Sequence, residues 1–307
     1  MWTANDIPDQ TGRTILVTGA NSGLGLAAAG LLAGRGARVL MACRSPERGE
    51  EALRTVGGAA ELVKLDLADL GSVHAAAKEI RARTGDRLDV LMNNAGVMMT
   101  PKRRTADGFE LQFGTNHLGH AALTWLLMPA LRAVSGARVV TLSSMAARPG
   151  QVDLADPQFE HRRYLPNTAY SQAKLANLLF ALELDRHARK AELDLVSVAA
   201  HPGYTATNLT ANMSRSRGGL AGTAMAVATA IGDRLFGQDV RIGVLPQVYA
   251  ATAPEVRGGE YYGPDGFREI RGHPHRVPIP TPGQDTEVAS KLWDLTAELT
   301  KVDPDPA

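Results

Sequence analysis

Six short runs of apolar residues recur along the chain, and each is followed by turn residues. They are RTILVTG (13–19), ARVLMAC (37–43), AELVKLDL (60–67), LDVLMNN (88–94), ARVVTLSS (137–144) and LDLVSVAA (193–200). Continuous apolar runs predict strands buried on both faces, and helical patterns fill the intervals between them. Alternating strands and helices indicate parallel pairing through right-handed crossovers. The pattern predicts an α/β fold with a doubly wound, mostly parallel central sheet flanked by helices.

The domain organisation follows from what interrupts this pattern. The chain of 307 residues shows no internal repeat, low-complexity tract or Pro/Ser-rich linker. We therefore expect a single domain over residues 1–307. Residues 1–11 have neither a basic leader nor an apolar core, which predicts a short N-terminal arm and a cytoplasmic protein.

One helical pattern carries a polar pair. Between Asn167 and Asp185 the apolar residues recur at a helical period, and Tyr170 and Lys174 fall one turn apart. Positions i and i+4 share a face of a helix, so the phenol and the ammonium lie side by side. A tyrosine at a core edge beside a lysine with a buried stem is the structural alternative.

Composition and charge narrow the functional classes. Lys and Arg number 33 against 32 Asp and Glu, a net charge of +1, which makes nucleic acid an unexpected partner. The single cysteine, Cys43, excludes an internal disulfide and a cysteine-based zinc site, and we interpret it as a small buried strand residue. The histidines show no metal-ligand spacing, so no metal is expected.

One uncharged stretch bears on membranes. Residues 218–232, GGLAGTAMAVATAIG, fall short of the roughly 20 apolar residues that a membrane span needs. The sequence therefore predicts no stable membrane insertion. Contact of this stretch with a membrane or an apolar substrate remains open.

Ligands of doubly wound sheets lie beyond the carboxyl ends of the strands. After the first run, the sequence TGANSGLG spaces its glycines as G-x-x-x-G-x-G before an Ala/Leu-rich helix. Glycines there allow close approach of the backbone to a pyrophosphate, and the helix N-terminus supplies free N–H groups. A purely structural turn is the alternative.

After the second run, the sequence ACRSPERG places Arg44 at the strand end, with Glu47 as the nearest acid. An acidic residue at this point would bind the ribose 2′-hydroxyl of NAD, whereas a guanidinium suits the 2′-phosphate of NADP. Arg44 therefore favours NADP(H), with NAD(H) as the alternative cofactor. An arginine exposed on a loop is the structural interpretation.

The remaining strand ends offer further candidates, each with an ordinary structural explanation. Asp66 could contact adenine, or Asp69 nearby could cap a helix. Asn and Gly also make turns, serines cap helices, and a lone histidine is more often structural than catalytic. The other candidates are Leu67, Asn93, Asn94, Ala95, Gly96, Ser143, Ser144, His201, Pro202 and Gly203.

Taken in order, six motifs resemble the short-chain dehydrogenase/reductase family. They are TGANSGLG, NNAG, Asn116 in TNHLGHAALT, the SS after the fifth run, YSQAK and HPG. The resemblance covers nearly the whole chain from Gly12 onward. The wording ACRSPERG, NHLGHAALT and YSQAKLANLLFALEL further resembles the retinol-dehydrogenase-like branch, which typically uses NADP(H) on lipophilic carbonyls and alcohols.

The resemblance implies a Rossmann-type domain and a role for each matching residue. Tyr170 matches the catalytic acid/base, Lys174 the residue that binds the nicotinamide ribose, Asn116 the proton-relay member and Ser144 the residue that holds the substrate oxygen. The implied cofactor contacts are Gly19, Asn21, Ser22, Gly23, Leu24, Gly25, Arg44, Asp66, Leu67, Asn94, Ala95, Gly96, Tyr170, Lys174, Pro202 and Gly203.

These roles explain the Tyr–Lys pair. A phenol has a reference pKa near 10, so it is a poor base at neutral pH unless the phenolate is stabilised. We expect the ammonium of Lys174, together with an oxidised nicotinamide, to lower the pKa of Tyr170. In reduction, a hydride reaches the carbonyl carbon while Tyr170 gives its proton to the oxygen.

One interval departs from the compact family pattern, and one further segment bears on the substrate. Ser144 and Tyr170 are 26 positions apart, about twice the expected interval, and the insertion could shape the substrate mouth. Residues 204–240, Ala-rich and poor in Leu and Phe, are predicted to form a substrate lid.

The leading hypothesis is an NADP(H)-dependent oxidoreductase that interconverts an alcohol and a carbonyl. The alternative is an NADP(H)-binding redox regulator without turnover, although a regulator needs no phenol beside an ammonium. Reduction of a carbon-carbon double bond, which some relatives of the branch perform on tetrapyrroles, has no supporting residue. A homo-oligomer is also open, since helices of this family often pair subunits.

Overall fold

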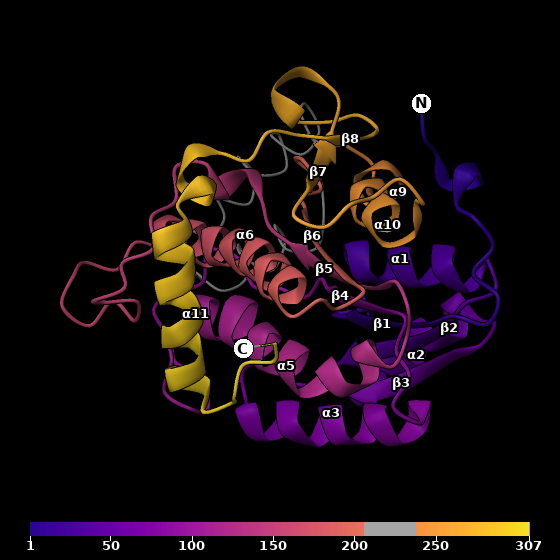
Figure 1. Ribbon diagram of the computed structural model, residues 1–307, viewed down its shortest axis with the longest axis horizontal. Coiled ribbons are helices and arrows are strands. Elements are labelled where there is room, and N and C mark those ends of the chain that lie inside the picture. Colours follow the sequence, from indigo (N-terminus) through magenta and orange to yellow (C-terminus); the bar gives the residue numbers. More distant parts are fainter. Residues whose placement is uncertain (206–237, 307) are drawn as a thin grey trace, which may run out of the picture.

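A parallel sheet forms the centre of the computed structural model, which describes residues 1–205 and 238–306 (Figure 1). Within this part of the chain the sheet has eight strands in the order β3-β2-β1-β4-β5-β6-β7-β8. The strands are β1 (Thr14–Thr18), β2 (Arg38–Cys43), β3 (Ala60–Lys64), β4 (Val90–Asn93), β5 (Ala137–Leu142), β6 (Leu195–Ala200), β7 (Tyr261–Pro264) and β8 (Pro274–Arg276).

The direction of winding changes between β1 and β4. Strands β1 to β7 pair in parallel, and only β8 runs antiparallel to its neighbour β7 within the described sheet. From β1 the chain proceeds outward to β2 and β3, then returns to β4 on the other side of β1. Such a reversal opens a crevice at the carboxyl ends of the two strands.

Helices cover both faces of the sheet (Figure 1). One face packs against α3, α5 and α6, and the other against α1, α2 and α10. The described helices are α1 (Gly23–Ala33), α2 (Pro46–Val56), α3 (Leu70–Thr84), α4 (Leu111–Phe113), α5 (Gly119–Arg132), α6 (Pro166–Lys190), α9 (Val240–Gly243), α10 (Leu245–Thr252) and α11 (Thr286–Thr300).

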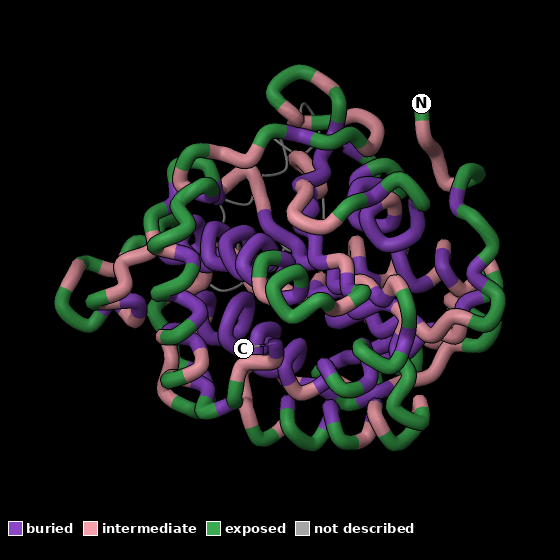
Figure 2. The backbone as a smooth tube through the Cα atoms, in the orientation of Figure 1, coloured by how far each residue is buried: buried purple, intermediate pink, exposed green. Residues whose placement is uncertain are grey.

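The strand residues alternate between two cores. Leu16 of β1 belongs to the core beneath α3 and α5, whereas Ile15 and Val17 belong to the core beneath α1 and α10. All three side chains are fully buried, and Figure 2 shows the strands and the inner helices as the buried part of the molecule. Burial on both faces explains why the strand sequences are continuously apolar. The predicted α/β class and the doubly wound, mostly parallel sheet are confirmed.

The final helix, α11, packs along α6 (Figure 1). Trp293 of α11 lies 4.9 Å from Trp125 of α5 and 5.4 Å from Phe180 of α6, measured between ring centroids. These buried rings join the C-terminal segment to the central helices. Aromatic pairs of this kind add about 0.5–1.5 kcal/mol beyond the area that they bury.

Sequence and structure can be compared at three further places: the strands β7 and β8, the predicted N-terminal arm and the predicted lid. Strands β7 and β8 were not predicted, because four and three residues with Gly and Pro form no apolar run. In the predicted arm, Ile7 is buried and Trp2 packs edge-on against Tyr249. The predicted lid lies outside the described residues except for 204–205 and 238–240.

Candidate functional site

A cleft lies at the carboxyl ends of β1, β2 and β4 and beside the segment after β3. It joins the glycine turn, the Arg44 segment, Asp66 and Leu67, and the NNAG turn. In the described part of the chain its lining residues are Gly19, Asn21, Ser22, Gly23, Leu24, Gly25, Ala42, Arg44, Ser45, Arg48, Leu65, Asp66, Leu67, Asn94, Ala95, Gly96, Val97 and Thr115.

Six of these residues were not predicted from the sequence: Ala42, Ser45, Arg48, Leu65, Val97 and Thr115. Arg48 carried a usable signal, because it lies four positions after Arg44 at the start of a helical pattern. Thr115 carried none, since the loop that brings it to the cleft is set by long-range packing.

The glycine turn brings α1 close to β1. Gly19 has φ +67°, a conformation that favours glycine. A Cβ added at Gly25 would lie 2.4 Å from the carbonyl oxygen of Gly19 and 2.5 Å from Nδ2 of Asn94. Helix α1 begins at Gly23, and the side chain of its N-cap residue, Ser22, makes no capping hydrogen bond. The first N–H groups of α1 are therefore available to an anion.

Two buried polar atoms at the cleft have no partner among the described residues. They are Oδ1 of Asn94 and Oγ1 of Thr115. Nδ2 of Asn94 donates to the carbonyl of Thr18 at 2.7 Å, which fixes the orientation of the amide. Buried polar atoms are nearly always hydrogen-bonded, so these two fit a ligand that carries hydroxyl groups. Together with the glycine turn they suit a dinucleotide.

The ends of β2 and β3 form the outer part of the cleft. Arg44 and Arg48 are exposed and form no ion pair with a described residue. Glu47 accepts a hydrogen bond from the Ser45 hydroxyl at 2.7 Å. Asp69 caps α3 by accepting from the backbone N–H of Ser72, as the structural alternative predicted.

Helix α6 carries Tyr170 and Lys174, and both are buried. These two residues, like Asn116 and Ser144, do not line the cleft. Nζ of Lys174 donates to the carbonyl of Leu142 at 3.0 Å and lies 6.0 Å from the centroid of the Tyr170 ring. A Cβ added at Gly96 would lie 3.6 Å from Nζ of Lys174 and 3.3 Å from Oδ1 of Asn116. The ammonium therefore adjoins the wall of the cleft at Gly96.

Burial dominates the pKa of Tyr170 in the protein alone. Burial raises it to about 12, although a hydrogen bond with Ser144 opposes this shift. Burial also lowers the pKa of Lys174 to about 8. Lys174 is not among the groups that shift the pKa of this phenol, and burial disfavours the phenolate. The protein alone therefore favours the protonated form of Tyr170.

The two serines after β5 have different surroundings. The Ser143 hydroxyl is buried and donates to the carbonyl of Lys174 at 2.7 Å. Ser144 begins a 3₁₀ turn, accepts from the N–H of Ala146 and is hydrogen-bonded to Tyr170. Only the second serine therefore contacts the phenol.

Asn116 lies in a π-helical turn, Gly114–Leu118, that precedes α5. Its Oδ1 accepts from the N–H of Val97 at 2.8 Å, and its Nδ2 donates to the carbonyl of Val97 at 2.9 Å. π-helical turns occur frequently at functional sites. The asparagine side chain anchors the wall of the cleft next to Gly96.

The segment after β6 lies outside this cleft. Nδ1 of His201 accepts from the N–H of Gly203 at 3.2 Å, and Nε2 donates to Glu269 at 2.8 Å. Glu269 also pairs with Arg148. Burial lowers the pKa of His201, so its imidazole is neutral. The histidine is a structural hydrogen-bonding residue, as expected, while Pro202 and Gly203 do not line the cleft.

Comparison with known proteins decides what kind of site this is. The family model described as "short chain dehydrogenase" matches residues 13–218. This chain is a short-chain dehydrogenase. Human retinol dehydrogenase 13 is 37% identical over 297 residues, covering 94% of this chain and 84% of the relative. Mouse polyprenol dehydrogenase is 38% identical over 303 residues, covering 96% and 85%.

A solved structure supports the fold of this short-chain dehydrogenase. An uncharacterized protein from Mycobacterium Paratuberculosis superposes with a TM-score of 0.82 at 42% identity, covering 98% of each chain. The dehydrogenase belongs to the retinol-dehydrogenase-like branch of its family and is an NAD(P)-dependent oxidoreductase of alcohols and carbonyls. The alternative of a regulator without turnover is not favoured by these relatives.

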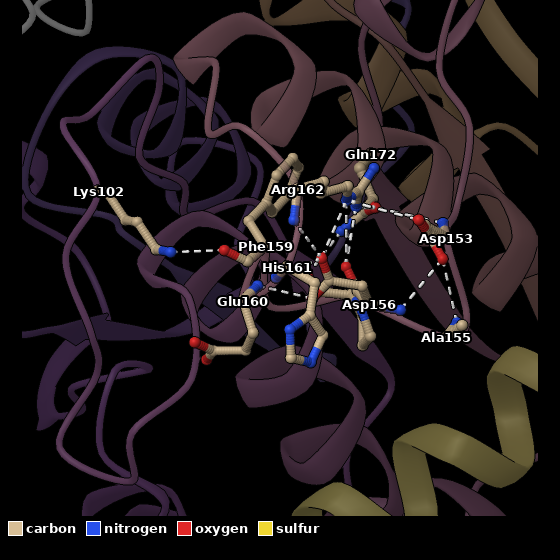
Figure 3. A network of polar contacts seen from close by, with 10 residues as sticks. Lys102, Asp153, Ala155, Asp156, Phe159, Glu160, His161, Arg162 and Gln172 are labelled. Atoms are coloured by element: carbon tan, nitrogen blue, oxygen red, sulfur yellow. Dashed lines mark hydrogen bonds and ion pairs between the residues drawn. The ribbon is translucent and has the colours of Figure 1, made fainter.

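Many hydrogen bonds stabilise the insertion between Ser144 and Tyr170 of this dehydrogenase (Figure 3). Asp156 accepts hydrogen bonds from three successive backbone N–H groups, those of residues 160–162. Nε2 of the buried Gln172 on α6 donates to a loop carbonyl at 2.9 Å. The insertion is therefore fixed to α6 beside the tyrosine. Within residues 1–205 and 238–306, no helix is both long and apolar enough to cross a membrane.

Acid stability provides a test of the buried histidines of the dehydrogenase. Burial lowers the pKa of His117 to about 3 and that of His120 to about 4, against roughly 6.5 when unfolded. Below pH 6.5 the unfolded chain binds protons that the folded chain excludes, so stability falls with decreasing pH. The slope reaches up to about 1.4 kcal/mol per pH unit for each histidine.

Urea unfolding of the wild type and His117→Asn at pH 7 and pH 5 measures this effect. We expect the variant to be less stable at pH 7, because His117 is hydrogen-bonded to Thr296 at 2.8 Å. Its stability should depend less on pH than that of the wild type. Equal pH dependences of the two proteins would contradict the assignment.

Proposed function

We propose that this dehydrogenase uses NADP(H) to interconvert lipophilic alcohols and carbonyls, with Tyr170 as the catalytic acid/base. The observation that carries the proposal is the position of Tyr170: a buried phenol, hydrogen-bonded to Ser144, beside the ammonium of Lys174 where that ammonium adjoins the cleft wall. In this assignment Lys174 binds the nicotinamide ribose and Asn116 belongs to the proton relay.

A bound nicotinamide supplies or accepts the hydride. In reduction, the carbonyl carbon gains the hydride, and Tyr170 transfers its proton to the carbonyl oxygen, which yields the alcohol. Ser144 holds that oxygen in place by a hydrogen bond. Oxidation runs in reverse, with the phenolate of Tyr170 accepting the hydroxyl proton. Burial of Tyr170 favours the protonated phenol that this direction requires.

The cleft residues take the cofactor roles that the family implies. The glycine turn and the first N–H groups of α1 bind the pyrophosphate. Asp66 and Leu67 contact the adenine, and Asn94 with Ala95 and Gly96 lies beside the ribose. Pro202 and Gly203 remain proposed contacts of the nicotinamide end, although they do not line the cleft. The supporting observations are the unpartnered oxygens of Asn94 and Thr115.

NADP(H) is favoured by the charges beside the adenosine end. Arg44 and Arg48 border the cleft at the N-terminus of α2, where a helix also favours an anion. Glu47, the nearest acid, is occupied by the hydroxyl of Ser45. Two guanidinium groups with no ion pair in the described chain suit a ribose 2′-phosphate.

Replacing both arginines tests this preference. In Arg44→Asp/Arg48→Asp, the Kd for NADPH should rise roughly 10- to 100-fold, since hydrogen bonds to a charged group contribute about 1.5–3 kcal/mol. The Kd for NADH should change little. Fluorescence titration measures both constants. Arg54→Asp, at an exposed position of α2, is the control for the charge reversal at one site. Equal losses for NADPH and NADH would remove the preference.

A lipophilic substrate is favoured by the relatives, which are named for retinol and polyprenol. The test compares the NADPH-dependent reduction of all-trans-retinal and decanal with that of propanal. A higher kcat/KM for the two long aldehydes is expected. Binding of NADPH without reduction of any of the three would contradict the proposed function.

A further inference from the structure

We propose that His120 is a positioning residue. Its imidazole, in a single tautomer, holds Asn116 on one side and the Asn94–Ala95 turn of the cleft on the other. This inference rests on the proposed function of the same site. His120 is buried in the first turn of α5. Its Nδ1 lies 2.8 Å from the carbonyl oxygen of Asn116, and its Nε2 lies 2.9 Å from Oγ1 of Thr18.

The partners determine the tautomer. A carbonyl oxygen only accepts, so Nδ1 of His120 carries the hydrogen. Burial and the nearby charge of Lys174 oppose a second proton on the ring. Nε2 therefore accepts, and the hydroxyl of Thr18 donates to it. The other acceptor of that hydroxyl, the carbonyl of Met92, is more distant at 3.3 Å.

The same hydroxyl organises the turn at the floor of the cleft. Oγ1 of Thr18 accepts from the backbone N–H groups of Asn94 and Ala95, each at 2.9 Å. Because its hydrogen is directed to His120, its lone pairs are free for these two groups. The imidazole thus sets the direction of the hydroxyl that holds the turn.

On its other side, His120 supports the π-helical turn. A regular α-helix would satisfy the carbonyl of Asn116 with the backbone N–H of residue 120, but a π-helical turn shifts this pairing by one residue. The imidazole of His120 supplies a donor to that carbonyl. Meanwhile, the side chain of Asn116 holds Val97. One ring therefore links both supports of the wall that contains Gly96.

Two substitutions separate the two bonds. The amide of Asn reaches the position of Nδ1, and that of Gln reaches the position of Nε2. His120→Asn should keep the bond to Asn116 and lose the one to Thr18, so the Kd for NADPH rises about tenfold while kcat is retained. His120→Gln should show the reverse, with kcat lowered about tenfold and NADPH binding retained.

His117→Asn is the matched control, because His117 is also buried in this region but binds Thr296 of α11. It should lower the melting temperature without separating NADPH affinity from kcat. If both His120 variants behave like this control, the inference is wrong. If wild-type protein does not bind NADPH, the proposed function itself fails.

The tautomer can be observed in the wild-type protein, independently of activity and of the folding of any variant. Nitrogen-15 NMR of the imidazole should report the neutral Nδ1–H form of His120, unchanged between about pH 5 and pH 8. The titratable groups facing this ring are His117 and Lys174. An Nε2–H tautomer, or protonation within that range, would overturn the inference.

Discussion

Replacing Tyr170 with Phe lowers kcat by roughly 10³-fold, because general acid catalysis by a positioned side chain contributes about 10²–10⁴-fold. The substitution removes only the hydroxyl that is hydrogen-bonded to Ser144, and the ring keeps its buried position. We therefore expect the Kd for NADPH and the melting temperature to change little. Steady-state kinetics with NADPH and decanal, together with fluorescence titration, measures the two quantities separately.

Tyr249→Phe is the matched control for this variant. The hydroxyl of Tyr249 binds Glu255 at 2.6 Å on an exposed surface of the domain, away from the cleft residues. Its loss should leave kcat unchanged. Full turnover by Tyr170→Phe would show that another group supplies the proton, and the proposed mechanism would then be wrong.

Gly25→Ala should abolish tight cofactor binding and destabilise the domain. The added methyl group would lie 2.4 Å from the backbone oxygen of Gly19 and 2.5 Å from Nδ2 of Asn94, so α1 must move away from β1. Overpacking of this kind costs about 1–3 kcal/mol of stability. Displacement of the helix N-terminus should raise the Kd for NADPH by at least about tenfold.

Gly30→Ala, on the same helix, is the control, because it makes the same glycine-to-alanine change without steric crowding. No atom lies within 4 Å of a Cβ added at Gly30. Alanine is favoured over glycine in helices by about 1 kcal/mol, so this variant should be as stable as the wild type or more stable. Thermal unfolding and NADPH titration of both variants make the comparison. Equal NADPH affinities for the two would exclude the proposed role of the glycine turn.

The sequence predicted six strands of the sheet and missed the last two. Strands β1, β2, β4, β5 and β6 were predicted because they are mostly buried on both faces and therefore carry apolar runs. Strand β3 lies at an edge and is only partly buried, but its Leu and Val residues still gave a strand pattern. Strands β7 and β8 lie at one edge of the sheet and contain Gly263, Pro264 and Pro274. Such short segments pair because the neighbouring strand offers a free edge, which no local pattern records.

Within the site, motif order identified the glycine turn, the NNAG turn and the Tyr170–Lys174 pair. The structure brings the two turns together at the cleft and places the ammonium of Lys174 beside Gly96 of its wall. The lowered tyrosine pKa was expected with an oxidised nicotinamide bound and stays a prediction. In the protein alone burial raises this pKa, and the sequence reveals the neighbouring charge but not the depth of burial. Arg48 and Thr115 were missed because their approach to the cleft depends on how α2 and the π-helical turn pack.

The sequence by itself determined the fold class, the family and the segments that meet at the carboxyl edge of the sheet. Apolar periodicity and glycine spacing are local properties of the sequence. They can be interpreted directly because each reflects the backbone geometry of a strand, a helix or a turn. Only the tertiary structure decided the tautomer of His120, the burial of Tyr170 and the different hydrogen-bond partners of Ser143 and Ser144. Those outcomes depend on desolvation and on partners far apart in the chain, which exist only after the sheet and helices have packed.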